Sequence, residues 1–346
     1  MSEVKKTSRK INLRWLPGVL ISAIAIFAIF KFVQFKDLAA AFSKVGWVFI
    51  LIVFSIDVIT MMIRGIAWRY ILGNKVTWKQ SFFGVCEGYF LNNIFPLRAG
   101  ELGRSIFVGK SSGLGTFHVL STIVIERAFD IAIAAILLLV TLPMVVGLAW
   151  VKTVALVVLF IVVVILVGLF LLARNRVQVA GWIEKRSDKS PFIHKYITPQ
   201  MSKLMDGLTP LTNPRQFLLS FFWISVTWVL WIVVYDVMVC QVIPDAPICS
   251  GAFVGSVFAP GVAIPSAPAA LGVYEATMVA AVVVLGGDES SALAVALIMH
   301  ALQFISSGIF GIWGLARERQ SLSSIYSRLQ NQTDGNIDST SQVAQM

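Results

Sequence analysis

The stretch LNNIFPLRAGELGR, residues 91–104, gathers polar and ionisable side chains between apolar segments. It contains two amides, two arginines and a carboxylate, namely Asn92, Asn93, Arg98, Arg104 and Glu101. The planar guanidinium of arginine holds a phosphate or a carboxylate through two parallel hydrogen bonds. The glycines Gly100 and Gly103 let a backbone approach a ligand closely, although helix packing explains them equally well. We therefore expect this stretch to form part of a binding site for an anionic group.

A second ionisable group, Glu126, Arg127 and Asp130, lies within an apolar run at residues 118–140. Glu126 and Asp130 are four residues apart and share a helix face, and Arg127 can reach Asp130 at the i,i+3 spacing. An ionisable side chain at the centre of a membrane helix costs on the order of 2.5–3.5 kcal/mol. One interpretation is therefore structural, a buried ion cluster that joins helices. We favour a functional one, in which this group folds against residues 91–104.

Together the two groups supply three arginines and three carboxylates: Arg98, Arg104, Arg127, Glu101, Glu126 and Asp130. Charges that are paired in this way can persist within a membrane and still offer guanidinium donors to an anion. Glu87 is a further candidate partner for Arg98.

The other ionisable residues of the apolar segments are interpreted as isolated. Asp57 and Asp236 fall within or beside such segments, and His300 lies near Gln303 in the last one. A single histidine on an apolar face is usually a hydrogen-bonded core residue. Glu275 differs because it directly follows a proline-rich stretch, so we include it among the candidate binding residues.

The composition identifies an integral membrane protein. Of 346 residues, 57% are hydrophobic and 13% are charged, and the mean hydropathy is +0.82, whereas soluble domains contain about 25% charged residues. The apolar runs approach the roughly 20 residues that cross a hydrocarbon core as a helix. We predict an all-α polytopic bundle of about eight membrane elements, with continuous spans at 15–32, 47–63, 118–140, 153–172, 217–239 and 292–315.

Two further apolar stretches, residues 80–103 and 252–285, are interrupted by proline and glycine. Proline inside a helix removes a backbone hydrogen bond, so we expect both stretches to be broken or re-entrant. Broken backbone at membrane depth is tolerated only inside protein or beside a water-filled cavity. Residues 96–103 align with 265–272, sharing the proline, the leucine and the final glycine, which is compatible with an inverted repeat. We expect the two breaks to meet near the membrane midplane.

Charge predicts the orientation. The formal net charge is +10. The simplest explanation of this excess is the orientation of the chain in the membrane, because short loops rich in Lys and Arg stay cytoplasmic. Residues 1–14 and the connection 174–215 are rich in such residues, so we place them and both termini in the cytoplasm of a bacterial cell. The first apolar run is expected to be an uncleaved anchor, with a cleaved signal as the alternative. The transmembrane domain is assigned to residues 15–316 and a disordered cytoplasmic tail to 317–346.

Motifs of familiar enzymes are missing from the sequence. It contains no His-Glu-x-x-His, P-loop, dinucleotide fingerprint or Asp-x-Asp pair. Cys86, Cys240 and Cys249 lack metal-ligand spacing, and we expect two buried free thiols at 240 and 249 rather than a disulfide. No metal, cofactor or nucleic-acid partner is therefore expected, and no enzymatic activity is predicted.

These motifs resemble the flippase-like transmembrane domain family, which contains the membrane part of lysylphosphatidylglycerol synthetases and stand-alone relatives. The resemblance rests on residues 92–104, on Glu126-Arg127 with Asp130, and on 265–275, and it covers about residues 11–317. It implies re-entrant segments and a role in moving lipids between leaflets. The family usually has adjacent glycines where this chain has Ala269 and Ala270. Only about thirty polar residues follow Trp313, so we expect no aminoacyltransferase domain.

Three functions remain open at this level. The leading one is a translocator of a lipid or lipid-linked intermediate whose anionic or phosphate-bearing head group enters the Arg/Glu cluster. A membrane-embedded transferase that uses a phospholipid or polyprenyl-phosphate donor is the second, with Glu101 or Glu275 as candidate base. A scaffold subunit that presents lipid to a partner enzyme, with the basic loop 174–215 as the docking surface, is the third. The expected partner is membrane lipid, and a partner enzyme or a homo-oligomer is left open.

Overall fold

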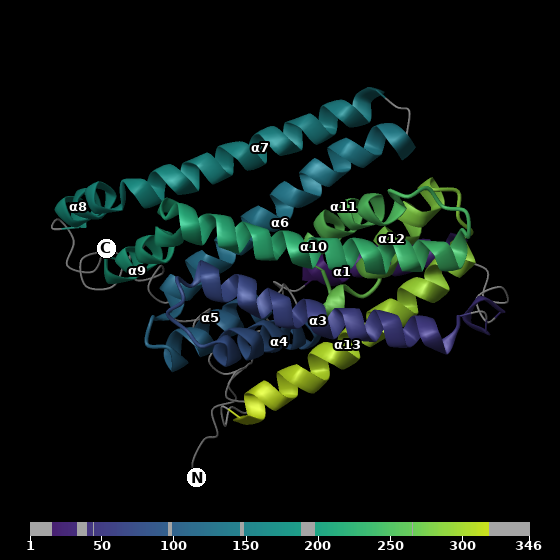
Figure 1. Cartoon of the computed structure of the whole chain (residues 1–346), viewed down its shortest axis with the longest axis horizontal. Coiled ribbons are helices and arrows are strands. Elements are labelled where there is room, and N and C mark those ends of the chain that lie inside the picture. The colour runs from purple at the N-terminus through teal and green to yellow at the C-terminus, as the bar shows by residue number, and fades with distance from the viewer. Residues whose placement is uncertain are drawn as a thin grey trace, which may run out of the picture.

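The computed structural model describes residues 16–32, 40–43, 45–95, 99–145, 149–187, 198–264 and 266–317. Within these ranges every regular element is a helix, and the long helices lie in one elongated bundle (Figure 1). The predicted all-α membrane bundle is confirmed. Residues 96–98 and 265, which include Pro96, Arg98 and Pro265, lie outside the described ranges.

The first half of the chain forms α1 (Leu16–Phe32), α3 (Trp47–Ile71), α4 (Trp78–Ile94) and α5 (Ala99–Ser111). The helix α3 ends where Gly73 and Asn74 adopt left-handed backbone, with φ of +66° and +58°. A capping box then starts α4, because Gln80 N–H donates to Thr77 Oγ1 at 3.3 Å and Thr77 N–H donates to Gln80 Oε1 at 2.9 Å. The span predicted to stop at residue 63 therefore continues for two more turns and carries Arg64 inside the helix.

The middle of the chain forms α6 (Thr116–Val145), α7 (Ala149–Arg174), α8 (Arg176–Ser187), α9 (Thr198–Gly207) and the short 3₁₀ helix η4 (Thr209–Thr212). The basic connection predicted over 174–215 is thus largely helical, and α9 packs against α6. Figure 1 shows α7 beside α6, along one side of the bundle.

The last part of the chain forms α10 (Pro214–Val242), α11 (Ser250–Ala263), η5 (Pro268–Ala270), α12 (Val273–Val284) and α13 (Glu289–Arg317). The side chain of Asn213 caps α10 by accepting from the N–H groups of Arg215 and Gln216 at 3.1 and 3.3 Å. The helix α10 packs against α3 and α11, and α13 packs against α4, α12 and α3.

Three helices of the described chain are long and apolar enough to cross a membrane: α3, α10 and α13. Many large apolar side chains of α7 point outward, and Phe160 is 69% exposed. In a membrane protein such faces contact lipid, so their exposure needs no soluble partner.

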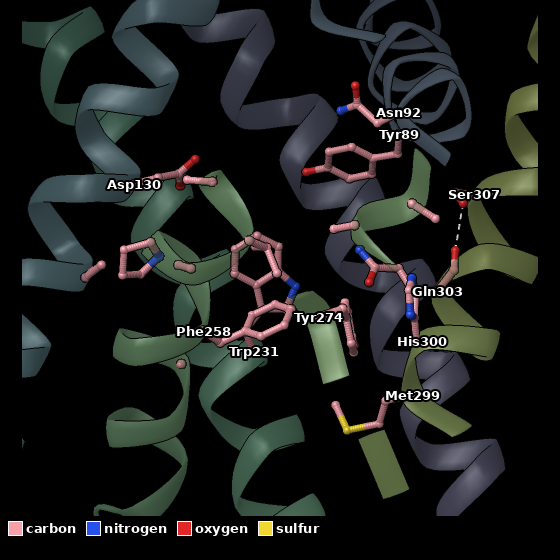
Figure 2. Close-up of a pocket in the computed structure, with 18 of the residues that line it drawn as sticks. Tyr89, Asn92, Asp130, Trp231, Phe258, Tyr274, Met299, His300, Gln303 and Ser307 are labelled. Carbon is pink, nitrogen blue, oxygen red and sulfur yellow. Dashed lines mark hydrogen bonds between the residues drawn. The ribbon is translucent and has the colours of Figure 1, made fainter. Parts of the chain in front are cut away.

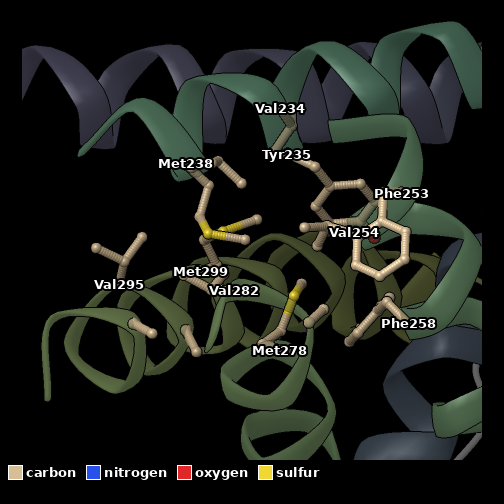
Figure 3. Packing of buried hydrophobic residues seen from close by; sticks show 14 of the residues in the cluster. Val234, Tyr235, Met238, Phe253, Val254, Phe258, Met278, Val282, Val295 and Met299 are labelled. Carbon is tan, nitrogen blue, oxygen red and sulfur yellow. The ribbon is translucent and has the colours of Figure 1, made fainter. Parts of the chain in front are cut away.

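The core joins α3, α10, α11, α12 and α13. Its centre is rich in methionine, with Met238, Met278 and Met299 buried beside Val282 and Val295 (Figure 3). Methionine fills irregular gaps between helices that cross at varied angles. This packing fixes α12 and α13 beside the second break.

Both interrupted stretches are broken, as predicted. In the first, α4 ends at Ile94 with Phe95 extended and α5 begins at Ala99, and the two helices pack side by side. The second separates α11 from α12 through η5. The helix α1 packs against α12, and Ser22 Oγ of α1 accepts from Ala267 N–H at 2.9 Å, which anchors the second break.

Candidate functional site

The two breaks meet in one cavity of about 530 Å³, which we call the central cavity (Figure 2). Its walls come from α3, α4, α5, α6, α10, α11, α13 and the segment that contains η5. Polar lining residues that the sequence predicted are Asn92, Asn93, Glu101, Arg104, Arg127 and Asp130. Described residues that flank both breaks thus line one cavity. The predicted meeting of Pro96 and Pro265 near the membrane midplane concerns residues outside the described ranges and stays a prediction.

Arg64 is the residue that organises the charges. Its Nε donates to Glu126 Oε1 at 2.9 Å and its Nη1 to Asp130 Oδ1 at 2.8 Å, and its Nη2 bonds Asp130 Oδ2. Trp228 Nε1 adds a donor to Asp130 Oδ1 at 3.1 Å. Arg64 therefore ties α3 to α6 through a bidentate pair, and Trp228 ties α10 to the same carboxylate.

Arg104 holds the other oxygen of Glu126. Its Nη2 donates to Glu126 Oε2 at 2.8 Å, and its guanidinium carbon lies 3.4 Å from the centroid of the Trp68 ring. Guanidinium stacks well on an aromatic face, which helps to compensate its burial. Both oxygens of Glu126 are thus occupied by arginines from different helices.

Arg127 and Glu101 are the accessible members of the group. Their side chains are 28% and 29% exposed, whereas those of Arg64 and Glu126 are each 1% exposed. Arg127 contacts Glu126 at 2.8 Å, Asp130 at 3.5 Å and Glu101 at 3.8 Å. The predicted reach from Arg127 to Asp130 is confirmed, and the contact with Glu101 is the longest of the three.

We call these six residues the arginine–carboxylate cluster: Arg64, Arg104, Arg127, Glu101, Glu126 and Asp130. Its three guanidinium groups match three carboxylates, so it is balanced in charge. Among the described residues the charges balance as predicted, and Arg64, which the sequence analysis omitted, supplies one of the three guanidinium groups. Arg98 lies outside the described residues, and its predicted role in the cluster stays a prediction.

The two asparagines have separate contacts. Asn92 Oδ1 accepts from Gly100 N–H at 2.8 Å, which ties the end of α4 to the start of α5. Asn93 Nδ2 donates to Ser307 Oγ of α13 at 2.8 Å. Both side chains line the central cavity while they hold its walls together.

A second polar pair lies on the opposite wall. His300 Nδ1 is 2.6 Å from Glu275 Oε1, and Glu275 Oε2 accepts from Gly272 N–H at 2.7 Å. The Tyr274 ring stacks on the His300 ring with a centroid distance of 4.0 Å. His300 and Tyr274 line the cavity, and Glu275 lies behind them. Figure 2 shows His300 and Gln303 facing the space across from Asp130.

The prediction that these residues are isolated was wrong. Besides the pair of Glu275 and His300, Asp57 accepts a hydrogen bond from Ser306, and Asp236 Oδ1 accepts from Gly251 N–H at 2.6 Å. These partners are 15 or more residues away in sequence, so helix packing alone brings them together.

Sequence reasoning missed Arg64 because it ended the span at residue 63. The usable signal was that the apolar pattern resumes after Arg64 through Gly65, Ala67 and Trp68. An arginine inside such a run requires a buried acidic partner, and Glu126 and Asp130 are candidates in another apolar run.

The second break carries strained backbone where the family usually has glycine. Ala269 and Ala270 have φ of +59° and +54°, a left-handed conformation that costs alanine roughly 1 kcal/mol each. Both residues line the cavity. The backbone therefore keeps the glycine-like shape, and the extra methyl groups narrow the cavity at this point.

The described cysteines are free thiols. Cys86 is buried, but Cys240 is exposed and Cys249 is half-buried. The predicted absence of a disulfide between Cys240 and Cys249 is confirmed, and their predicted burial is wrong.

Comparison with known proteins identifies the family. The model described as the lysylphosphatidylglycerol synthase TM region matches residues 15–311. A UPF0104 membrane protein of Methanocaldococcus jannaschii is 27% identical over 120 residues, which are 33% of this chain and 36% of that protein. A UPF0104 membrane protein of Methanothermobacter thermautotrophicus is 29% identical over 126 residues, which are 36% of this chain and 38% of that protein. Each alignment thus spans little more than a third of the relative. The family match covers most of the sequence, and the chain belongs to the lysylphosphatidylglycerol synthase TM region family.

Proposed function

We propose that this protein moves a lipid with an anionic head group between membrane leaflets, with the head group in the central cavity. The observation that carries this proposal is Arg127, an accessible guanidinium in a charge-balanced cluster that faces a cavity inside a membrane bundle. A phosphate that crosses hydrocarbon unaided loses its hydration shell. Fixed donors around a cavity replace that water and lower the barrier.

The arginines of the cluster have two roles, because two of them hold the structure and one can exchange its partner for a ligand. Arg64 and Arg104 are buried and paired with Glu126 and Asp130, so they hold the helices and neutralise the site. Arg127 can exchange its 3.8 Å contact with Glu101 for a phosphate oxygen. Such an exchange needs no unpaired charge in the empty state, which makes release of the head group possible.

Arg98 completes the proposal from the sequence. It precedes Glu101 by three residues on the same broken segment, and we assign it as a second donor to the head group. Arg98→Ala should then impair exchange, and Arg98→Lys should rescue only in part, because an ammonium lacks the guanidinium fork.

The apolar wall suits acyl chains. Ile131 of α6 lines the cavity and is 44% exposed, and Pro260 and Ala263 of α11 line it and are exposed as well. The cavity therefore meets the hydrocarbon between α6 and the end of α11. Lipid tails can stay in the membrane there while the head group occupies the polar side.

Leaflet exchange in proteoliposomes tests this function. Fluorescent phosphatidylglycerol in the inner leaflet should become accessible to an impermeant quencher in the presence of the protein, and mass analysis should recover it chemically unchanged. A changed lipid would instead support the transferase, with Glu101 or Glu275 as candidate base. Intact lipid without exchange by the purified chain would favour the subunit that presents lipid to an enzyme.

The proposed orientation places both termini and the α8–α9 region in the cytoplasm of a cell membrane, following the basic residues. Lys203 on α9 and Asp288 before α13 are both exposed, so each can be replaced by cysteine in a background without other thiols. An impermeant thiol reagent added to intact cells should label Asp288→Cys and spare Lys203→Cys. Labelling of both positions from outside contradicts the orientation.

A further inference from the structure

We propose that His300 and Glu275 form a proton-binding site of the central cavity, and that the bound proton favours entry of the anionic head group. The inference rests on the proposed function for the nature of the cargo. It starts from an unusual placement, because the pair lies inside a membrane bundle and its histidine lines the same cavity as Arg127. Intramembrane Glu and His pairs are typical of proton relays.

The geometry defines which atom exchanges the proton. Both oxygens of Glu275 are engaged, Oε1 by His300 Nδ1 at 2.6 Å and Oε2 by Gly272 N–H at 2.7 Å. Glu275 is 3% exposed and does not line the cavity, so His300 is the member of the pair that faces it. With Nδ1 committed to the carboxylate, Nε2 is the ring atom that can take a proton from cavity water and return it.

The charge of the pair then depends on that proton. Imidazolium with carboxylate is neutral overall, whereas neutral imidazole with carboxylate has a charge of minus one. The stacked face of Tyr274 stabilises the imidazolium by a cation–π contact, since the rings are 4.0 Å apart and inclined by 10°. A negative pair repels an anionic head group in the same cavity, and a neutral pair does not.

Other ionisable groups lie near the pair on α3, α4 and α10. Asp57 of α3 lines the cavity and accepts a hydrogen bond from Ser306, and Glu87 of α4 lies against Gly314, further along α13. Tyr89 of α4 and Tyr235 of α10 line the cavity, and Asp236 of α10 bonds the Gly251 amide. The helix α11 has no ionisable residue, and the described side chains of α1 include none. Across the cavity lies the balanced arginine–carboxylate cluster.

Histidine is the side chain whose charge ordinarily changes between about pH 5 and 8. Two unit charges about 10 Å apart at an effective dielectric constant near 20 interact strongly enough to change a binding constant by roughly tenfold. We therefore expect acidification through this range to favour anions and to disfavour cations in the cavity by about tenfold each, so that their ratio changes by about a hundredfold.

The test measures cavity charge directly. Ala267 lines the cavity, so Ala267→Cys is placed in a background in which Cys240 and Cys249 are serine. Its reaction rates with an anionic and a cationic methanethiosulfonate are expressed as a ratio. Ionisation of the thiol affects both rates equally, so it does not change this ratio. The ratio of anionic to cationic rates should rise about a hundredfold between pH 8 and pH 5.

Controls separate this site from other titrations. In the Ala267→Cys protein, the further change His300→Gln should make the ratio independent of pH. The further change His118→Gln should leave the pH response of the ratio unchanged, because His118 is buried at the start of α6 and does not line the cavity. The exposed Cys240, kept alone with Ala267 unchanged, gives the reference for a site outside the cavity. A flat ratio in the parent, or an unchanged response in His300→Gln, overturns the inference.

A transport measurement separates this inference from the proposed function. An acidic compartment on the loading side should accelerate exchange of phosphatidylglycerol several-fold, and the acceleration should vanish in His300→Gln. If lipid exchange does not depend on the pH gradient and the labelling ratio does not depend on pH, the proton site is contradicted and the proposed translocator is still supported. A labelling ratio that titrates at His300 without any lipid exchange supports the proton site and contradicts the translocator.

Discussion

Replacing Arg64 with methionine should destabilise the fold by about 3–5 kcal/mol, the loss measured when one partner of a buried ion pair is removed. Arg64 bonds Glu126 at 2.9 Å and Asp130 at 2.8 Å, and its side chain is 1% exposed. Without it Asp130 keeps only Trp228 and the longer contact with Arg127, although its side chain is only 11% exposed. Thermal unfolding of detergent-purified protein should show a large drop in Tm and poor recovery of monodisperse protein.

Matched variants distinguish loss of the Arg64 ion pair from a general effect of replacing an arginine on α3. Arg69→Met, on the same helix, removes an arginine whose Nε donates only to Val76 O at 3.1 Å, and it should change Tm little. The double variant Arg64→Met with Asp130→Asn removes both charges and should recover part of the loss. If Arg64→Met unfolds at the same temperature as Arg69→Met, the buried ion pair does not hold α3 to α6.

Gly100→Ala should separate α4 from α5. A Cβ atom at this position would lie 2.0 Å from Gly88 O and 2.7 Å from Asn92 Oδ1. These are a backbone atom and a short, tethered side chain, so neither can retreat without moving a helix. Overpacking a core typically costs 1–3 kcal/mol of stability, and we expect a clash with backbone to cost about 3 kcal/mol or more. We expect a lower Tm and loss of the hydrogen bond from Gly100 N–H to Asn92.

Gly308→Ala is the matched control for this steric effect. Gly308 lies within α13, and no atom would contact an added Cβ within 4 Å. Alanine there should be neutral or stabilise the helix by up to about 1 kcal/mol. Equal Tm values for Gly100→Ala and Gly308→Ala would show that α4 and α5 are not packed as closely as described.

Much of the fold follows from local sequence. Long apolar runs predict helices, and proline with glycine predicts the two breaks, because both effects act within a few residues. The same reasoning failed at Arg64, since a single charge was read as the end of a span. Helicity over 174–215 was also missed, because polar helices at a membrane surface lack the apolar periodicity that identifies a span.

The candidate site was predictable where its members are neighbours in sequence. Glu126, Arg127 and Asp130 share one helix, so their spacing predicts their contact. The contacts of Arg64 with Asp130 and of Glu275 with His300 join different helices, 66 and 25 residues apart in sequence. Such pairs depend on how helices cross, and a single sequence does not determine that.

The central claim is that an accessible guanidinium in the central cavity receives an anionic lipid head group, and Arg127→Gln tests it most directly. Exchange of fluorescent phosphatidylglycerol should be measured in proteoliposomes for the wild type, Arg127→Gln, Arg127→Lys and Lys203→Gln, a control whose basic residue on α9 does not line the cavity. We expect Arg127→Gln to lower the rate at least tenfold, roughly the effect of losing one charge-assisted hydrogen bond. Arg127→Lys should be intermediate, and Lys203→Gln should match the wild type. Exchange by correctly folded Arg127→Gln at the wild-type rate would contradict the claim.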